Sequence, residues 1–205
     1  MESVMQNSQV VFDSSGIQEY FDSGTTSKKY MMNTSETMLV YYNNDKELER
    51  EMQEYRKGKI MQFSNEISII INHDEYVDGE VSQSEIFMKE AYENEQMDYV
   101  MEALMQIYMD NLSNAHVLEG ILVMVSCVPY EVVQPKGQAI AMGLLSNKEL
   151  LIRDRAIQCF ERWNSKKGLD VLKSLDCQPK WLQKYVDKII KYIESRVNAF
   201  FSTKA

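Results

Sequence analysis

Apolar residues recur at a spacing near 3.6 positions from residue 45 onward, with charged residues between them. This pattern predicts amphipathic helices. The first segment, residues 45–71, predicts one or two helices that are broken or kinked near Gly58, because glycine weakens a helix interior. The run 67–71 is so rich in isoleucine that it also fits a strand, and both assignments stay open.

Seven further helices follow from the same pattern. Ser82 or Ser84 can cap the first of them, because a serine side chain accepts a hydrogen bond from the first helical turn. A turn is expected between Pro129 and Pro135. The first of these helices carries residues 86–92, and the others span 97–108, 117–128, 137–145, 150–163, 165–175 and 179–197.

The predicted helices recur at a regular interval. Leu145-Ser146-Asn147 comes 33 residues after Leu112-Ser113-Asn114, and Leu175 comes 30 residues after Leu145. Helix pairs at such a spacing are typical of α-solenoids, in which helical hairpins stack side by side. The pattern therefore predicts an all-α protein with stacked helical hairpins in its second half.

The first 44 residues have a different character. Residues 1–37 are rich in Ser, Thr, Asn, Gln and Gly and contain only short apolar islands. Met38–Tyr42 is the best strand candidate, because its residues have high β-propensity. We therefore expect an irregular N-terminal segment, residues 1–44, that packs along a helical domain, residues 45–205.

Residues 144–156 (Leu-Leu-Ser-Asn-Lys-Glu-Leu-Leu-Ile-Arg-Asp-Arg-Ala) resemble a HEAT-repeat unit of the armadillo/HEAT superfamily. In such a unit, a leucine-rich first helix ends in a short polar turn. A branched apolar residue, an arginine and a small residue then begin the second helix. Ile152, Arg153 and Ala156 stand at those places in this sequence.

The resemblance is best over residues 137–175 and implies HEAT-like helix pairs from about residue 97 to 197. It also implies that Arg153 is a structural residue between repeats. In physical terms, the small Ala156 lets two helices approach closely, while larger apolar residues fill the seam with the next pair. Those larger residues are Ile152, Phe160 and Trp163. The unit that begins at Leu112 lacks the arginine.

The charge is unevenly distributed along the chain. The net charge is −9: residues 1–147 hold 9 Lys and Arg against 24 Asp and Glu (−15), and residues 148–205 hold 13 against 7 (+6). Nonspecific nucleic-acid binding by the whole molecule is disfavoured, because phosphate contacts need a concentrated positive surface. A basic partner for the acidic part, or an anionic partner for the tail, remains open.

Composition also bears on localisation. No run of about 18 apolar residues is present, so no membrane span is expected. The first residues lack the pattern of a secretory signal, and we expect a cytoplasmic protein. Cys127, Cys159 and Cys177 are odd in number and widely spaced, which predicts reduced thiols that fill apolar space.

Residues with catalytic or metal-binding potential are few. The histidines are His73, which precedes Asp74 and Glu75, and His116; neither has a further ligand at a metal-site spacing. Residues 74–80 do not match a calcium loop, and no phosphate loop or nucleophile motif is present. The sequence predicts no catalytic residue, metal or cofactor, and a nonenzymatic protein is the favoured interpretation.

The last helix carries the most informative surface. Four lysines recur at spacings of 4, 4 and 3 residues, which places them on one line of the helix. They are Lys180, Lys184, Lys188 and Lys191. The predicted opposite, apolar face comprises Trp181, Leu182, Tyr185, Ile189, Ile190 and Ile193. The line is either the solvated face of a terminal helix or a docking strip for an acidic partner or phosphate, extended by Arg153 and Arg155.

Acidic residues form a counterpart on the first long helix. Glu47, Glu51 and Glu54 are, with the four lysines, the candidate partner-binding residues. A solvated face is one interpretation, and an acidic surface that binds a basic protein is the other. Further acidic residues follow at Glu90, Glu93, Glu95 and Asp98.

We therefore expect a noncatalytic protein-binding module: a scaffold, an adaptor or an inhibitor, for which an immunity-type protein against a basic toxin is one version. The alternative is a nucleic-acid-binding or DNA-glycosylase-like HEAT protein that uses the lysines with Trp163, Trp181 and Asp170. An enzyme would be favoured by a deep pocket that gathers His116 with acidic side chains.

Overall fold

The computed structural model describes residues 9–12, 17–21, 29–32, 38–41, 45–77 and 79–202, with side chains between Leu48 and Arg196. The chain divides into two compact units, Met1–Lys57 and Gly58–Ala205. The predicted packing of residues 1–44 along the helices stays a prediction.

The N-terminal unit contains a four-stranded antiparallel sheet. Its strands, β1 (Gln9–Phe12), β2 (Ile17–Phe21), β3 (Lys29–Met32) and β4 (Met38–Tyr41), are paired in chain order. The register places Val10 opposite Tyr20 and Tyr30 opposite Val40. The sequence predicted a strand only at residues 38–42. The other three strands coincide with apolar islands too short to show an alternating pattern, so pairing between neighbouring strands defines them.

Helix α1 (Asp45–His73) begins in the N-terminal unit and runs without interruption through Gly58. The predicted break at this glycine is absent. The alternative of a strand at residues 67–71 is also wrong. Ile67 and Ile71 are both buried, whereas Ile69 is 62% exposed. Burial at positions four apart, with exposure between them, is the helical period.

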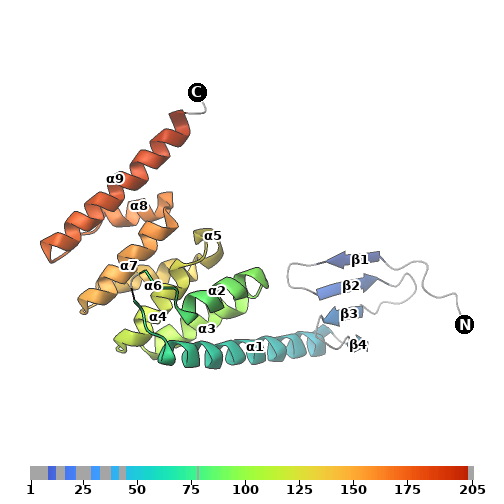
Figure 1. Ribbon diagram of the computed structural model, residues 1–205. Helices are drawn as coiled ribbons and strands as arrows, with labels where there is room; N and C mark the ends of the chain where they lie inside the picture. Colours follow the sequence, from blue (N-terminus) through green and yellow to red (C-terminus); the bar gives the residue numbers. More distant parts are fainter. Residues whose placement is uncertain are drawn as a thin grey trace, which may run out of the picture. The chain divides into compact units, whose positions relative to one another are not determined.

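From Asp45 onward the described chain is all-α, as predicted (Figure 1). The long first helix is followed by α2 (Gln83–Glu93), α3 (Met97–Asp110), α4 (Ala115–Ser126), α5 (Tyr130–Val133), α6 (Lys136–Leu144), α7 (Leu150–Trp163), α8 (Lys166–Lys173) and α9 (Lys180–Ser202). The expected turn between the two prolines contains the single helical turn α5.

Polar side chains fix where several helices begin. The Ser82 hydroxyl accepts a hydrogen bond from the Glu85 N–H, and the Glu85 carboxylate accepts one from the Ser82 N–H, which is a complete capping box for α2. At α4 the Asn114 side chain accepts a single hydrogen bond from the Val117 N–H, and at α8 the Ser165 hydroxyl accepts one from the Gly168 N–H. Ser82, one of the two predicted candidates, is therefore the cap.

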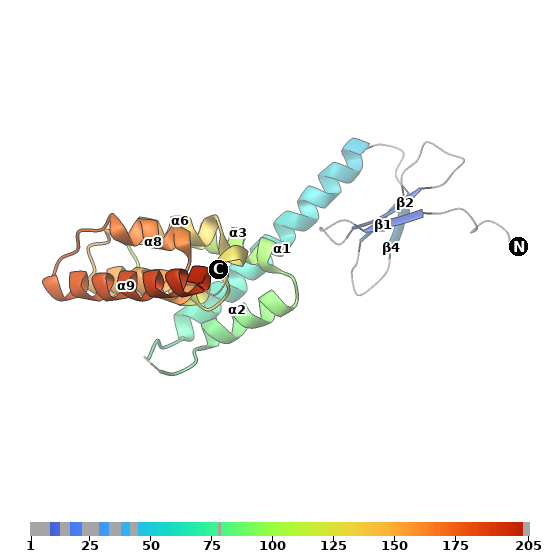
Figure 2. The same ribbon diagram turned by 90° about the horizontal axis from the view of Figure 1, so that it is seen from above.

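The helices of the C-terminal unit pack around α4 and α7. Helix α4 contacts α2, α3 and α7, and α7 in turn contacts α6, α8 and α9. Helices α2, α4, α7 and α9 thus form a row, with α2 at one end and α9 at the other (Figures 1 and 2). The residues predicted to fill the seam, Ile152, Ala156, Phe160 and Trp163, are all buried.

Candidate functional site

The α9 lysine strip consists of Lys180, Lys184, Lys188 and Lys191. All four side chains are exposed, and within the described part of the chain none of them forms an ion pair. Their exposure follows from the helical period, because the residues on the other side of α9 are buried. Those buried residues are Leu182, Val186, Ile189 and Ile193.

Two aromatic residues flank the α9 lysine strip. Trp181, predicted on the apolar face, is instead 50% exposed, because the buried stripe starts at Leu182 and leaves its neighbour at the edge. Tyr192, for which the sequence predicted no role, is 51% exposed. The two rings are 11 residues, or about 16 Å, apart along the helix. The Arg196 guanidinium lies 5.9 Å from the centre of the Tyr192 ring.

Polar contacts hold α9 against its neighbours. The Tyr185 hydroxyl donates a short hydrogen bond to the Glu161 carboxylate on α7, and burial together with this carboxylate raises the pKa of Tyr185. Lys173 on α8 lies 2.7 Å from Glu194 on α9. The lysine strip is therefore carried by an anchored helix rather than by a loose terminus.

Arg153 does not extend the strip. Its Nη1 donates to the carbonyl oxygens of Asn147 (2.6 Å) and Lys148 (3.1 Å), and its Nη2 donates to that of Gln178 (3.1 Å). The first two carbonyls belong to the turn before α7 and the third to the turn before α9. Arg153 thus clamps two turns together, and its contacts are structural.

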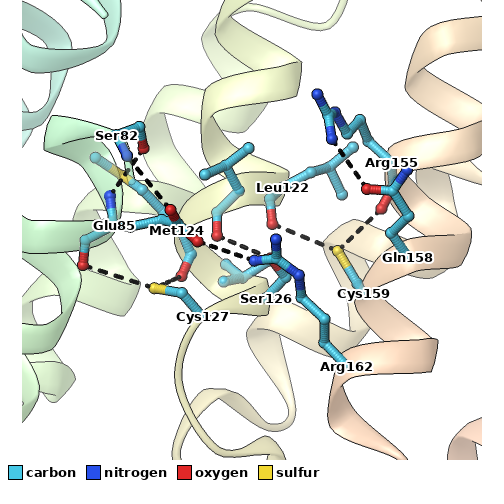
Figure 3. Close-up of polar contacts among 12 residues, drawn as sticks. Ser82, Glu85, Leu122, Met124, Ser126, Cys127, Arg155, Gln158, Cys159 and Arg162 are labelled. Atoms are coloured by element: carbon cyan, nitrogen blue, oxygen red, sulfur yellow. Dashed lines mark hydrogen bonds and ion pairs between the residues drawn. The ribbon is translucent and has the colours of Figure 1, made fainter. Parts of the chain in front are cut away.

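Arg155 is also engaged inside the protein. Its Nε lies 3.0 Å from the Glu119 carboxylate on α4. Its Nη1 donates a hydrogen bond to Gln158 on its own helix (Figure 3). A further bond runs from Nη2 to the Tyr76 carbonyl, 3.3 Å away, in the loop before α2. The expected extension of the strip by Arg153 and Arg155 is therefore wrong, because both guanidinium groups serve internal contacts.

The third arginine of α7, Arg162, reaches across α4 to α2. Arg162 Nη1 lies 3.0 Å from the Glu85 carboxylate and 3.2 Å from the Ser126 hydroxyl (Figure 3). The thiols of Cys127 and Cys159 lie near this contact (Figure 3). Burial raises the pKa of Cys159 to about 12, and burial with the neighbouring Glu85 carboxylate raises that of Cys127 to about 11.

The residues considered for metal binding have structural partners. The buried Asp74 carboxylate accepts hydrogen bonds from the backbone N–H groups of Glu75, Gln83 and Ser84, at 3.1, 3.3 and 2.7 Å. His73 Nδ1 lies 2.8 Å from the carbonyl oxygen of Ile69. Across residues 45–77 and 79–202, no group of three or more His, Cys, Asp or Glu side chains is placed to hold a metal ion.

His116 has a comparable environment. Its Nε2 lies 2.7 Å from the carbonyl oxygen of Ile71, and its ring is 5.6 Å from the ring of Tyr76. The Tyr76 hydroxyl in turn lies 3.2 Å from the Ser84 hydroxyl. These groups join α1, the loop after it, α2 and α4 by packing and hydrogen bonds.

The acidic candidates lie in the part of α1 that belongs to the N-terminal unit. Glu54 is 3.8 Å from Arg50, one turn away, and both side chains are 69% exposed. Glu51 is half-buried, and the side chain of Glu47 lies outside the described residues. An exposed pair of this kind is weak, but it partly neutralises the carboxylate that a basic partner would meet.

Comparison with known proteins gives no family assignment: no family model, no curated protein and no solved structure matches this chain. Within the described residues, no helix combines the length and the apolar character that crossing a membrane requires. Function therefore has to be inferred from the residues themselves.

Proposed function

We propose that this chain is a noncatalytic protein-binding module, built on HEAT-type helical hairpins, whose α9 lysine strip docks an acidic surface of a partner protein. The observation that carries the proposal is the set of four exposed lysines without an ion pair in the described part of the chain. A row of like charges on a firmly packed helix offers a partner a fixed pattern of positive charge.

The flanking aromatic residues support a protein interface. Trp and Tyr are enriched at the energetic centres of protein interfaces, because they bury a large area with few rotatable bonds. Trp181 and Tyr192 lie half-exposed on either side of the middle lysines. The lysines would then speed encounter and set specificity, and the rings would supply contact area.

Nucleic acid is the competing ligand, and two observations disfavour it. The strip is one lysine wide and shares α9 with Asp187 and Glu194, whereas phosphate binding gains from a broad positive surface. Trp163, which a glycosylase-like protein would need near a base, is buried and donates its indole N–H to the Val125 carbonyl at 3.0 Å. Trp163 is therefore committed to the core.

A basic partner for α1, including a toxin bound by an immunity-type inhibitor, is supported less well. Glu54 already faces Arg50, and Glu51 is half-buried. The described side chains of this part of α1 therefore offer fewer exposed, unpaired carboxylates than α9 offers exposed, unpaired lysines.

Fluorescence anisotropy tests the proposal with two probes of equal charge: a labelled glutamate-rich helical peptide and a labelled single-stranded DNA. We expect the peptide to bind and the binding to weaken as salt shortens the Debye length from about 14 Å to below 8 Å. The K184E/K188E variant should lose peptide binding, whereas the matched variant K57E/K166E, changed at exposed lysines outside the strip, should keep it.

Three results would overturn the proposal. They are no peptide binding at low salt, equal binding by wild type and K184E/K188E, and binding of the DNA in preference to the peptide. The third result would assign the strip to nucleic acid.

A further inference from the structure

The two ends of the helix row carry opposite charge. At one end, α2 and the start of α3 expose four acidic residues that have no ion pair in the described part of the chain. We name Glu90, Glu93, Glu95 and Asp98 the α2–α3 acidic corner. Helix α9 lies at the other end of the row (Figure 1), and its lysine strip is exposed.

We propose that the acidic surface received by the α9 lysine strip is the α2–α3 acidic corner of a second copy of this chain, so that copies associate head to tail. The inference rests on the proposed function, because it names the partner of the same strip. Four carboxylates would meet four ammonium groups, and each set lacks a partner among the described residues of its own chain.

The position of the two surfaces decides the type of association. Because α2 and α9 stand at opposite ends of the row α2–α4–α7–α9, the corner of one copy is free to meet the strip of the next. An interface between two different patches is heterologous, and an assembly that does not close into a ring keeps one free patch at each end. Association should therefore continue beyond a dimer as the concentration rises.

Each surface also has apolar contact area beside its charges. Tyr92, 44% exposed, lies between Glu90 and Glu93 in the sequence, and Ile86 is exposed one turn before them. Trp181 and Tyr192 stand beside the lysines of α9. Each surface thus combines aromatic rings with charges, and the charges of the two surfaces have opposite signs. This composition is expected of a specific but salt-sensitive contact.

The strength of the contact should be low. Exposed ion pairs each contribute little, so the copies should separate on dilution and at high salt. A protein of 23.9 kDa should therefore appear monomeric when dilute and heavier when concentrated at low salt.

Sedimentation velocity of the purified full chain tests the inference. Samples from about 10 μM to about 300 μM, a span suited to weak affinities, are compared at about 50 mM and about 500 mM salt. We expect the weight-average mass to rise above 23.9 kDa with concentration at low salt only.

Charge reversal then identifies the two surfaces. K184E/K188E alone and E90K/E93K alone should each remain monomeric. An equimolar mixture should associate again, because the unchanged acidic corner of the first variant then meets the unchanged lysine strip of the second. The matched variant K57E/K166E should associate as the wild type does. Circular dichroism checks that each variant keeps its helical content.

A mass of 23.9 kDa at every concentration in low salt would overturn the inference. So would unchanged association of E90K/E93K, which would remove the corner from the interface. If the wild-type chain stays monomeric but K184E/K188E still fails to bind the acidic peptide, only the proposed self-association is overturned. Failure of the wild-type chain to bind the acidic peptide at low salt would overturn the proposed function itself.

Discussion

The guanidinium of Arg155 on α7 lies 3.0 Å from the carboxylate of Glu119 on α4, and both side chains are only 12% exposed. The pair sits where the two central helices meet, and the Tyr76 carbonyl shares the same guanidinium. Two opposite charges at this depth stabilise the fold only together, because either one alone would remain desolvated without a counter-charge.

The first prediction concerns this pair. Arg155→Met should lower the free energy of unfolding by about 3 kcal/mol, since Glu119 would be left buried and unpaired. Urea unfolding followed by circular dichroism measures the change. The control is Arg50→Met, which removes the exposed 3.8 Å pair with Glu54 and should cost about 0.5 kcal/mol or less. Equal losses in the two variants would contradict this account.

The second prediction compares two glycines inside helices. A Cβ added at Gly58 would have no neighbour within 4 Å, so Gly58→Ala should stabilise the protein by about 0.5–1 kcal/mol through helix propensity alone. A Cβ added at Gly120 would collide with the Tyr76 hydroxyl and come within 2.9 Å of Ile71. Gly120→Ala should therefore destabilise it by about 1–3 kcal/mol. Thermal unfolding of the two variants should shift in opposite directions.

The third prediction is a pH dependence at Asp74. Burial acts to raise the pKa of this carboxyl, but hydrogen bonds from Ser84, Gln83 and Glu75 outweigh it and hold the pKa below 3.8. Asp74 therefore contributes stability above about pH 4, its unfolded pKa. That contribution is lost as the pH falls through the lower folded value.

Asp74→Ala should accordingly cost about 1–2 kcal/mol at pH 7, because three backbone N–H groups lose their acceptor. The difference from wild type should shrink as the pH falls below 4. Urea unfolding at pH 7, 5 and 3 measures it. The control is Asp170→Ala, which removes an exposed carboxyl on α8 and should cost less than about 0.5 kcal/mol at pH 7.

The fourth prediction concerns the thiols. Cys127, Cys159 and Cys177 are unpaired, and burial raises the pKa of each. With a pKa of about 11, Cys127 is about one part in a thousand thiolate at pH 8. Ellman's reagent should therefore titrate the three thiols slowly in the native protein and within seconds in guanidinium chloride. Rapid native reaction of Cys159 would contradict its burial.

The fifth prediction separates the two tryptophans. Trp181 is 50% exposed beside lysines, whereas Trp163 is buried between Tyr130 and Phe160, at 5.7 and 5.5 Å between ring centres. Iodide, an anion, should quench the fluorescence of Trp163→Phe, which keeps Trp181, far more than that of Trp181→Phe. Trp163→Phe should also cost about 1–2 kcal/mol, because the Val125 carbonyl loses its donor.

The sequence predicts helices well where local rules decide them. Helix α7 has the predicted bounds, Leu150–Trp163, because its apolar period is strong, and the cap of α2 is Ser82, one of the two serines predicted for it. Strands β1, β2 and β3 were missed because each is only four or five residues long. An island that short carries no period, so pairing with its neighbours has to decide it.

The candidate site was predictable to a smaller extent. The exposed line of lysines follows from helical spacing, whereas the role of Arg155 does not. Its partner Tyr76 is 79 residues away in the sequence, and no local sequence pattern predicts a contact between residues so far apart. The sequence placed Trp181 on the apolar face of the last helix. The buried stripe starts one residue later, at Leu182, so Trp181 is exposed instead.

The clamp formed by Arg153 has a consequence for how this fold tolerates change. All three of its acceptors are main-chain oxygens, so the identity of the side chains at Lys148 and Gln178 is immaterial to the bonds. Those two positions can vary freely and take on new recognition chemistry, while the hairpins behind them keep their alignment. The bonds between these two turns depend on Arg153 itself and not on the side chains of the residues that it meets.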